Sequence, residues 1–366
     1  MSETVFDFAI VGAGMAGASL AAELAPHANV IVMEAEDAPG YHATGRSAAF
    51  WDECYGGPKV VPLTLASGDF LRTGGFLRQR GALHIARDED LGALNRFMET
   101  FADTGATIQR LERSDFAARV PKLRSEWRHA IWEEACADID VGALHAHYLG
   151  QMKLKGVRLE THARLANAVF ANGCWDIACE SGFKVRAQTI VNAAGAWADE
   201  AALKCGINPI GIQPMRRTVA QIRVSPAAPQ DLPLVLDING GFYFKSDNGR
   251  LWLSPHDETP SAPCDAAPEE LDVANAIDRF QKVADWPIEH VERRWAGLRS
   301  FAPDRLPVYG RDLREPAFAW FAGQGGFGIQ TAPAAARFMA QKLLSQEADA
   351  MTANICNETY DPARFG

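Results

Sequence analysis

The chain has 366 residues, of which 48% are hydrophobic and 22% are charged, and its formal net charge is −10. This length suits a globular protein with two domains, because one domain usually takes ~100 to 200 residues. The acidic balance argues against a nucleic-acid footprint, which needs clustered lysine and arginine side chains. We therefore expect a small-molecule partner and no nucleic acid.

The sequence carries no sign of export or membrane insertion. No apolar run reaches the ~18 to 20 residues of a membrane span, and a strand begins near the N-terminus without a charged n-region and cleavage site. The seven cysteines are scattered, with no C-x-x-C pair and no Cys/His cluster at metal-ligand spacing. The sequence therefore predicts a cytoplasmic protein with reduced thiols, no membrane span and no metal site.

The N-terminal segment has the pattern of a dinucleotide-binding unit. An apolar run at 5–11 predicts a buried parallel strand, and G-x-G-x-x-G follows it directly at 12–17. Next come a helical pattern from Met15 to Ala25 and a second apolar strand from Asn29 to Met33, which Glu34 closes. A glycine triplet alone is weak evidence. Strand, helix, strand and acid in register predict dinucleotide binding.

Each residue type in this motif has a physical task. Gly12 allows a tight turn, Gly14 lets the backbone approach a pyrophosphate, and Gly17 lets the helix pack closely on the strand. Free N–H groups at the start of the helix then face the phosphates. Glu34, 22 residues after Gly12, is placed to accept hydrogen bonds from an adenosine ribose.

Three further segments favour FAD over NAD. Residues 39–49 form a polar loop that ends in small residues, which let the backbone approach a flat ring. Residues 189–197 predict a buried strand ending in a small-residue turn, at the sheet edge where ligands bind. A strand at 318–322 leads through the glycine-rich segment 323–328 into a helix expected from Ile329 to Leu344. The N-terminus of that helix would face a developing anion.

These segments resemble the D-amino-acid oxidase and glycine oxidase superfamily of flavoproteins over nearly the whole chain, and within it they are most similar to bacterial D-arginine dehydrogenase. The most specific pieces are YHATGRSAAF at 41–50, DIDVGALHAHY at 138–148, VNAAGAW at 191–197, WAGLRSF at 295–301 and GQGGFGIQT at 323–331. The resemblance implies an α/β and α+β fold, in which a Rossmann-like FAD-binding domain is interleaved with a substrate domain built on a mixed β-sheet. The expected FAD-binding domain comprises residues 1–80, 139–208 and 300–366, and the expected substrate domain comprises 81–138 and 209–299.

The motifs and the resemblance together give a set of expected FAD-binding residues. These are Gly12, Gly14, Gly17, Glu34, Gly45, Arg46, Ser47, Ala48, Ala194, Gly195, Trp197, Gly325, Gly326, Gly328, Ile329 and Gln330. We expect the FAD to be noncovalent, because no cysteine or histidine stands near the C-terminal glycine-rich motif as an attachment site.

Two arginines are the first candidates for substrate binding. Arg299 lies among apolar and small residues, where an unpaired guanidinium would be costly, so it needs an anionic partner. That partner is either a protein carboxylate or, as the resemblance implies, the substrate carboxylate. Arg216 and Arg217 enter a predicted strand, so their side chains point to opposite faces. The resemblance selects Arg217 for the site, and for Arg216 we expect a solvated or structural ion pair.

Two tyrosines complete the expected substrate site. The resemblance implies that Tyr243 hydrogen-bonds the substrate carboxylate, although an aromatic residue on a strand more often serves packing. Tyr55 matches a lid or active-site tyrosine, and its loop placement leaves both interpretations open. None of the nine histidines has the neighbours of a catalytic base, and oxidation of an unprotonated amine needs no strong base.

We therefore expect oxidative deamination of D-amino acids by hydride transfer from Cα to flavin N5, followed by hydrolysis to a 2-oxo acid and ammonia. One alternative is a glycine- or sarcosine-type amine oxidase, and another is a flavoprotein whose FAD is structural. An NAD-dependent dehydrogenase is disfavoured, because the central and C-terminal motifs would have no role in it. The electron acceptor is unknown, but Trp252 stands where sarcosine oxidases carry an oxygen-activating lysine, so we expect a dehydrogenase.

The expected side-chain pocket differs from that of D-arginine dehydrogenase. The glutamate that pairs with a cationic substrate there aligns with Ala82 here. Phe50 and Trp51 are expected to form an apolar wall, so neutral or hydrophobic substrates should be preferred. Asp52 or Glu53 remains an alternative source of negative charge.

Overall fold

The computed structural model describes residues 5–366. Its first sheet is mixed, and its strands are β1 (Val5–Val11), β2 (Val30–Met33), β9 (Arg158–Glu160), β10 (Leu165–Ala171), β11 (Cys174–Cys179), β12 (Lys184–Asn192), β19 (Val308–Arg311) and β20 (Phe318–Ala322). The order is β10-β11-β12-β1-β2-β9, with β20 paired to β12 and β19 to β20. The apolar strands β1 and β2 pair in parallel, as expected for strands covered on both faces.

Helices cover both faces of this sheet. On one face α1 (Met15–Leu24), α5 (Val141–Leu154) and α8 (Ala332–Leu344) pack together, and α2 (Val61–Thr73) packs on α8. Leu20, Met152 and Met339 belong to the core that these helices share. The other face carries α6 (Ala198–Lys204), whose alanines join a second core with Trp175 and Trp320.

The second sheet is built on two long antiparallel strands. Its strands are β5 (Ala82–Ala86), β6 (Ile108–Glu112), β7 (His129–Glu133), β13 (Gln213–Val224), β14 (Leu234–Asp237), β15 (Tyr243–Asp247), β16 (Arg250–Ser254), β17 (Thr259–Pro260), β18 (Ile288–Phe301) and β21 (Gln324–Gly325). The order is β21-β18-β13-β16-β15-β14-β5-β7-β6, with β17 on β13. Helix α7 (Glu270–Gln281) lies against β13 and β16, and its Phe280 packs on Phe244 of β15.

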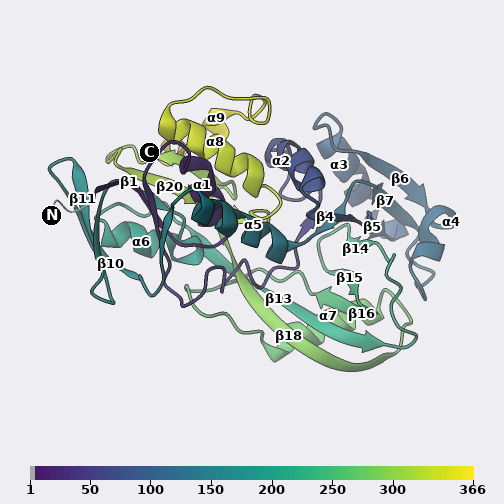
Figure 1. Cartoon of the computed structure of the whole chain (residues 1–366). Helices are drawn as coiled ribbons and strands as arrows, with labels where there is room; N and C mark the ends of the chain where they lie inside the picture. The colour runs from purple at the N-terminus through teal and green to yellow at the C-terminus, as the bar shows by residue number, and fades with distance from the viewer. Residues whose placement is uncertain (1–4) are drawn as a thin grey trace.

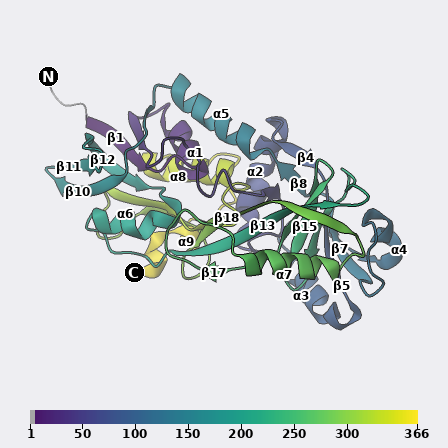
Figure 2. The same cartoon turned by 90° about the horizontal axis from the view of Figure 1, so that it is seen from below.

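A small third sheet links the two large ones along the chain. It consists of β3 (Phe50–Trp51), β4 (Leu77–Gln79) and β8 (Ala137–Ile139). Strands β1, β10, β11 and β20 of the first sheet lie at the left of Figure 1, and β5, β7 and β15 lie at the right, with β13 and β18 running between these regions. Figure 2, seen from below, shows α5 and α7 on opposite sides of the molecule. The remaining helices are α3 (Leu91–Phe101), α4 (Arg113–Phe116), α9 (Asn357–Tyr360) and four 3-10 helices, Asp88–Asp90, Ala117–Arg119, Gly195–Trp197 and Pro362–Phe365.

The main elements expected from the sequence are present, with shifted boundaries at two helices. The strand at 5–11 is confirmed, and the helix expected from Met15 to Ala25 ends at Leu24. The C-terminal helix was expected to begin at Ile329 but begins at Ala332, because the turn after the glycine-rich segment continues to Thr331. Along residues 5–366, no helix combines the length and apolar character of a membrane span. All seven cysteines are unpaired thiols.

Candidate active site

One large cavity runs between the two large sheets. Its volume is about 450 Å³, and its walls come from the glycine turn after β1, the loop at 40–56, the turn after β12, strands β13 and β18, and the glycine-rich segment before α8. Every residue expected to bind FAD or substrate lines this cavity except Gly17 and Gly45. The structure therefore brings together segments that lie far apart in the sequence.

The glycine turn after β1 leaves no room for side chains. Gly12 has a φ of +100°, and a Cβ there would lie 2.7 Å from the carbonyl oxygen of Ala193. A Cβ on Gly17 would lie 1.9 Å from the carbonyl oxygen of Gly12. Gly17 therefore serves close packing of α1 on the turn, the task expected of it, and stands behind the cavity wall. The exposed backbone of this turn fits the pyrophosphate of a dinucleotide.

Glu34 lies at the end of β2 and next to this turn. Its carboxylate accepts hydrogen bonds from the backbone N–H of Ala13 at 2.7 Å and of Glu36 at 3.0 Å. The residue is buried, and it lines the cavity. This is the place where a ribose hydroxyl would meet a carboxylate in a dinucleotide fold.

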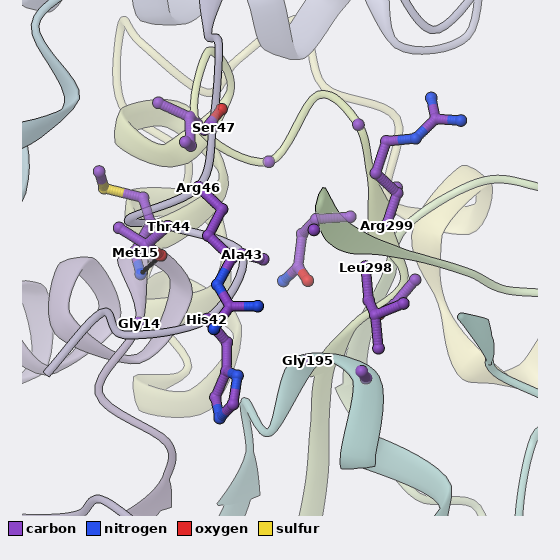
Figure 3. A pocket seen from close by; sticks show the side chains of 18 of the residues that line it. Gly14, Met15, His42, Ala43, Thr44, Arg46, Ser47, Gly195, Leu298 and Arg299 are labelled. Atoms are coloured by element: carbon purple, nitrogen blue, oxygen red, sulfur yellow. Dashed lines mark hydrogen bonds between the residues drawn. The ribbon is translucent and has the colours of Figure 1, made fainter. Parts of the chain in front are cut away.

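The loop at 40–49 forms the middle of the cavity wall. Figure 3 shows Gly14 and Thr44 on one side of the cavity and Leu298 and Arg299 on the strand across from them. The Arg46 guanidinium forms an ion pair with Asp265, and it also donates to the carbonyl oxygen of Ala266 at 2.8 Å. Arg46 therefore contributes its stem and backbone to the wall, while its charged group is already partnered.

Gly45 shapes this loop from behind. Its N–H donates to the carbonyl oxygen of Gly40 at 2.8 Å, and a Cβ on it would come within 2.8 Å of the same oxygen. Gly45 therefore closes a tight turn, and this explains why it does not face the cavity.

The turn after β12 and the segment before α8 complete the cofactor end. Gly195 and Gly325 have positive φ values of +55° and +52°. A Cβ on Gly326 would lie 2.0 Å from the hydroxyl oxygen of Tyr55. The side chain of Gln330 donates to Thr64 Oγ1 at 2.8 Å and to the carbonyl oxygen of Asp52 at 3.1 Å. Gln330 therefore ties the start of α8 to the segment after β3.

Arg217 and Arg299 lie together at the other end of the cavity. They come from the paired strands β13 and β18, in which Met215 is directly opposite Arg299. Arg217 is two residues from Met215, so the two arginines are diagonal neighbours on one face of the sheet. Their side chains are only 8% and 12% exposed. Two buried guanidinium groups on the same face strongly attract an anion.

Arg299 already has partners from the protein. Its Nη2 donates to Glu258 Oε1 at 2.7 Å, and its Nη1 donates to the hydroxyl oxygen of Tyr55 at 3.1 Å. Burial lowers the pKa of Arg299, but Tyr55 and Glu258 outweigh burial, so its pKa is raised. Arg299 therefore has a protein carboxylate, that of Glu258, as a partner, which was one of the two partners expected from the sequence.

Arg217 is less completely partnered. Its Nε donates to the carbonyl oxygen of Asp257 at 2.8 Å, but its buried Nη2 has no hydrogen-bond partner among the described residues. Burial and the nearby Arg299 lower the pKa of Arg217. Arg216 points to the other face of β13, as the alternation of a strand predicts, and pairs there with Asp272 of α7 and with Glu269, the residue before that helix.

Aromatic side chains surround the two arginines. Tyr243 is buried, and its ring centroid lies 6.0 Å from the Arg217 guanidinium carbon and 5.8 Å from the ring centroid of Phe50. Phe50 lines the cavity as expected. The expectation that Trp51 lines it was wrong, because Trp51 is buried against α2 and donates to the carbonyl oxygen of Thr64.

Sequence reasoning missed three residues of the loop that follows β16. Asp257 and Glu258 supply the oxygen atoms around the arginines described above. His256 lines the cavity and holds its Nδ1 2.7 Å from the carbonyl oxygen of Gly240. Burial and Arg217 lower the pKa of His256 to about 3, so the imidazole is neutral at pH 7. The sequence SPHDET at 254–259 predicts only a surface loop, and its density of polar residues after a strand was the available signal.

The acid that is missing at Ala82 has a counterpart on the neighbouring strand. Ala82 on β5 is directly opposite Glu133 on β7. Asp52 and His84 line the cavity, whereas the Glu53 carboxylate accepts a hydrogen bond from the N–H of Thr107 outside the cavity wall. Asp52 and Glu133 therefore bring two carboxyl groups to this region.

Comparison with known proteins decides the family. The model of the family described as FAD dependent oxidoreductase matches residues 7–342. The chain belongs to this family. Its cofactor is FAD, and the glycine turns, the buried Glu34 carboxylate and the cavity between the sheets fit that cofactor. The resemblance to the D-amino-acid oxidase superfamily is confirmed, and the closeness to D-arginine dehydrogenase stays a prediction.

Similar proteins act on several kinds of amine, according to their names. An opine oxidase polypeptide of Rhizobium meliloti is 26% identical over 345 residues, which cover 87% of this chain and 89% of that protein. The rat dimethylglycine dehydrogenase is 25% identical over 214 residues, which cover 53% of this chain and 24% of that protein. Among solved structures, L-proline dehydrogenase from P. horikoshii has a TM-score of 0.85 and 22% identity, and the match covers 100% of this chain and 98% of that one. At that identity the structural likeness shows the fold.

Proposed function

We propose that the protein oxidises the Cα–N bond of an amino acid, with D-amino acids as its substrate class. The observation that carries the proposal is the buried pair Arg217 and Arg299 on one wall of the FAD cavity. A guanidinium fork binds a carboxylate through two parallel hydrogen bonds. The D configuration is supported by the resemblance of the sequence motifs.

The residues of this chain would bind and orient the substrate. Arg217 and Arg299 would hold the substrate carboxylate, and Tyr243 and Tyr55 would pack beside it, so that the Cα–H faces the cofactor. Bound FAD supplies the hydride acceptor at N5. The amine enters without its proton, so no strong base is required, and this agrees with the lowered pKa of His256, which makes its imidazole a weak base. The resulting imino acid leaves and is hydrolysed to a 2-oxo acid and ammonia.

A second candidate is oxidation of a secondary amine that carries a carboxylate. It is favoured by the similarity to the opine oxidase polypeptide over 87% of this chain. Both candidates use the same arginines, so the site geometry suits both. Product analysis separates them, because a primary amino acid gives ammonia whereas an N-substituted one gives an amine.

A third candidate is a flavoprotein whose FAD is structural. This hypothesis predicts bound flavin that no amine reduces. The main proposal predicts instead that a D-amino acid bleaches the flavin when oxygen is absent. We propose noncovalent attachment, so acid precipitation should release the yellow colour from the protein.

We propose that neutral or hydrophobic side chains are preferred. Ala82 offers no acid to a cationic substrate, and Phe50 and Leu236 line the cavity near Tyr243. Asp52 also lines the cavity. An unpaired carboxylate at low dielectric is costly. The charge of Asp52 must therefore be balanced before an apolar substrate side chain can bind next to it.

A further inference from the structure

Three titratable side chains form a buried cluster at one end of the cavity. Asp52 follows β3, His84 lies on β5 and Glu133 ends β7. One ligand atom from each residue lies within 4.8 Å of the others. The three residues are 1%, 6% and 0% exposed, and Asp52 and His84 line the cavity wall.

The two carboxylates of this cluster lack a partner of opposite charge. Among residues 5–366, neither Asp52 nor Glu133 forms an ion pair, although both are buried. Two adjacent buried carboxylates repel each other and lose their hydration, so they need a proton or a cation. The cluster therefore needs a positive charge that no described side chain supplies.

Glu133 and His84 each have one buried atom without a hydrogen-bond partner among the described residues, and other contacts hold all three side chains in place. Glu133 Oε1 accepts from the N–H of Glu53 at 2.6 Å, whereas Glu133 Oε2 has no partner in the described chain. Asp52 Oδ1 accepts from the N–H of Cys54 at 2.8 Å. The buried Nε2 of His84 also lacks a partner within residues 5–366, and its ring is fixed by packing on Phe97 at 4.8 Å between centroids.

We propose that Asp52, His84 and Glu133 bind a divalent transition-metal ion of the zinc class. An imidazole nitrogen and two carboxylate oxygens are ligands that Zn²⁺ accepts, at about 2.0 to 2.2 Å. The dication balances both carboxylates, which a single proton does not. The buried Nε2 of His84, which has no hydrogen-bond partner among the described residues, is the nitrogen that would bind the ion. The cavity side leaves a fourth position for water or a substrate atom.

This site could not be predicted from the sequence, because its three ligands lie far apart along the chain. Its ligands are residues 52, 84 and 133, which lie in three separate segments, so no short sequence motif predicts the site. The hydrogen bonds from Glu53 and Cys54 to the second oxygens of the carboxylates orient these ligands, as is usual around bound metals. The proposal goes beyond the oxidation of amines and does not depend on it.

The bound ion would also connect to the substrate end. Asp52 lies three residues before Tyr55, whose hydroxyl accepts from Arg299 at 3.1 Å. An ion that holds the Asp52 side chain in place would therefore also hold the short segment that positions Tyr55. A neutralised cluster also agrees with an uncharged substrate side chain in this part of the cavity.

The test uses the FAD-loaded, full-length protein. After dialysis against a chelator and then against metal-free buffer, Zn²⁺ is titrated by calorimetry, and bound zinc is counted by mass spectrometry after gel filtration. We expect one zinc per chain in the wild type. His84→Asn and Glu133→Gln should each weaken binding at least tenfold. The flavin spectrum and thermal midpoint identify a variant that fails to fold.

His129→Asn is the matched control. His129 also lies on β7 between two acids, but its two ring nitrogens lie 3.0 and 2.9 Å from Asp88 and Glu112. This variant should bind zinc as the wild type does. The proposal is overturned if the wild type holds no zinc, or if zinc binding survives in both cluster variants. It is also overturned if the cluster variants change only the turnover of substrates with a distal ammonium group.

Discussion

Glu258 holds the same guanidinium that is proposed to bind the substrate. Its Oε1 accepts from Arg299 Nη2 at 2.7 Å and from Arg305 Nη2 at 2.8 Å. The side chain of Glu258 is 35% exposed, whereas that of Arg299 is 12% exposed. The more exposed Glu258 carboxylate, which lies on the loop after β16, therefore pairs with the buried Arg299 guanidinium. A substrate carboxylate must displace Glu258 or share Arg299 with it.

Replacing Glu258 by Gln should strengthen substrate binding. The variant removes the competing charge from Arg299, and a charge-assisted hydrogen bond contributes about 1.5 to 3 kcal/mol. We expect KM for amino acids to fall several-fold, measured by steady-state kinetics with a dye acceptor. Glu292→Gln is the control, since Glu292 pairs with Arg223 and Arg250 on the same sheet. A KM that stays the same or rises would count against competition by Glu258.

Replacing Arg299 by Met should lower catalytic efficiency while FAD stays bound. The lost contact to the substrate carboxylate is worth about 1.5 to 3 kcal/mol, so kcat/KM should fall at least tenfold. Arg216→Met is the matched control, because Arg216 pairs with α7 on the opposite face of β13. Loss of flavin or of folding in Arg299→Met, with kcat/KM per folded molecule preserved, would favour a structural role.

The pH dependence of stability should report His256. Burial and Arg217 lower its pKa from 6.5 to about 3 in the folded protein. Between these two values the unfolded chain binds the proton and the folded chain does not, so stability is lost as pH falls. The thermal midpoint should therefore drop less between pH 7 and pH 5 in His256→Gln than in the wild type. Equal drops in the two proteins would contradict the burial of a neutral imidazole.

The reduced enzyme should prefer a dye or quinone to oxygen. The sequence resemblance implies that Trp252 takes the place of the lysine of sarcosine oxidases. Lys245, which lies 5.1 Å from the Trp252 ring centroid, is held by Asp138 at 2.8 Å. Neither residue lines the cavity. Reoxidation is followed by the return of flavin absorbance in stopped flow. Rapid formation of peroxide in air would show that the protein is an oxidase.

The glycine turn and Glu34 at the cofactor end were predictable because they are close in sequence. The G-x-G-x-x-G turn, the helix after it and Glu34 lie within one strand-helix-strand unit, where local propensity and spacing determine the geometry. The opposite faces of Arg216 and Arg217 were predictable in the same way, from the alternation of a strand.

The substrate end was only partly predictable because its contacts are long-range. The pairing of Arg299 with Glu258 joins residues 41 positions apart, and it depends on the path of the loop after β16. The position of Glu133 opposite Ala82 depends on the register of β5 and β7. The start of α8 was placed three residues early, because a glycine-rich turn carries no helical periodicity to mark its end.

The most direct test mixes the purified, FAD-loaded protein with single amino acids in the absence of oxygen and follows the visible absorbance of the flavin. The set pairs D- with L-methionine and D- with L-phenylalanine, and it includes D-arginine, D-lysine, glycine and sarcosine. We predict that D-methionine or D-phenylalanine bleaches the flavin, with a larger kcat/KM than D-arginine or D-lysine. Bleaching by sarcosine alone would favour the secondary-amine candidate, and flavin that no compound bleaches would contradict the proposed oxidation of amino acids.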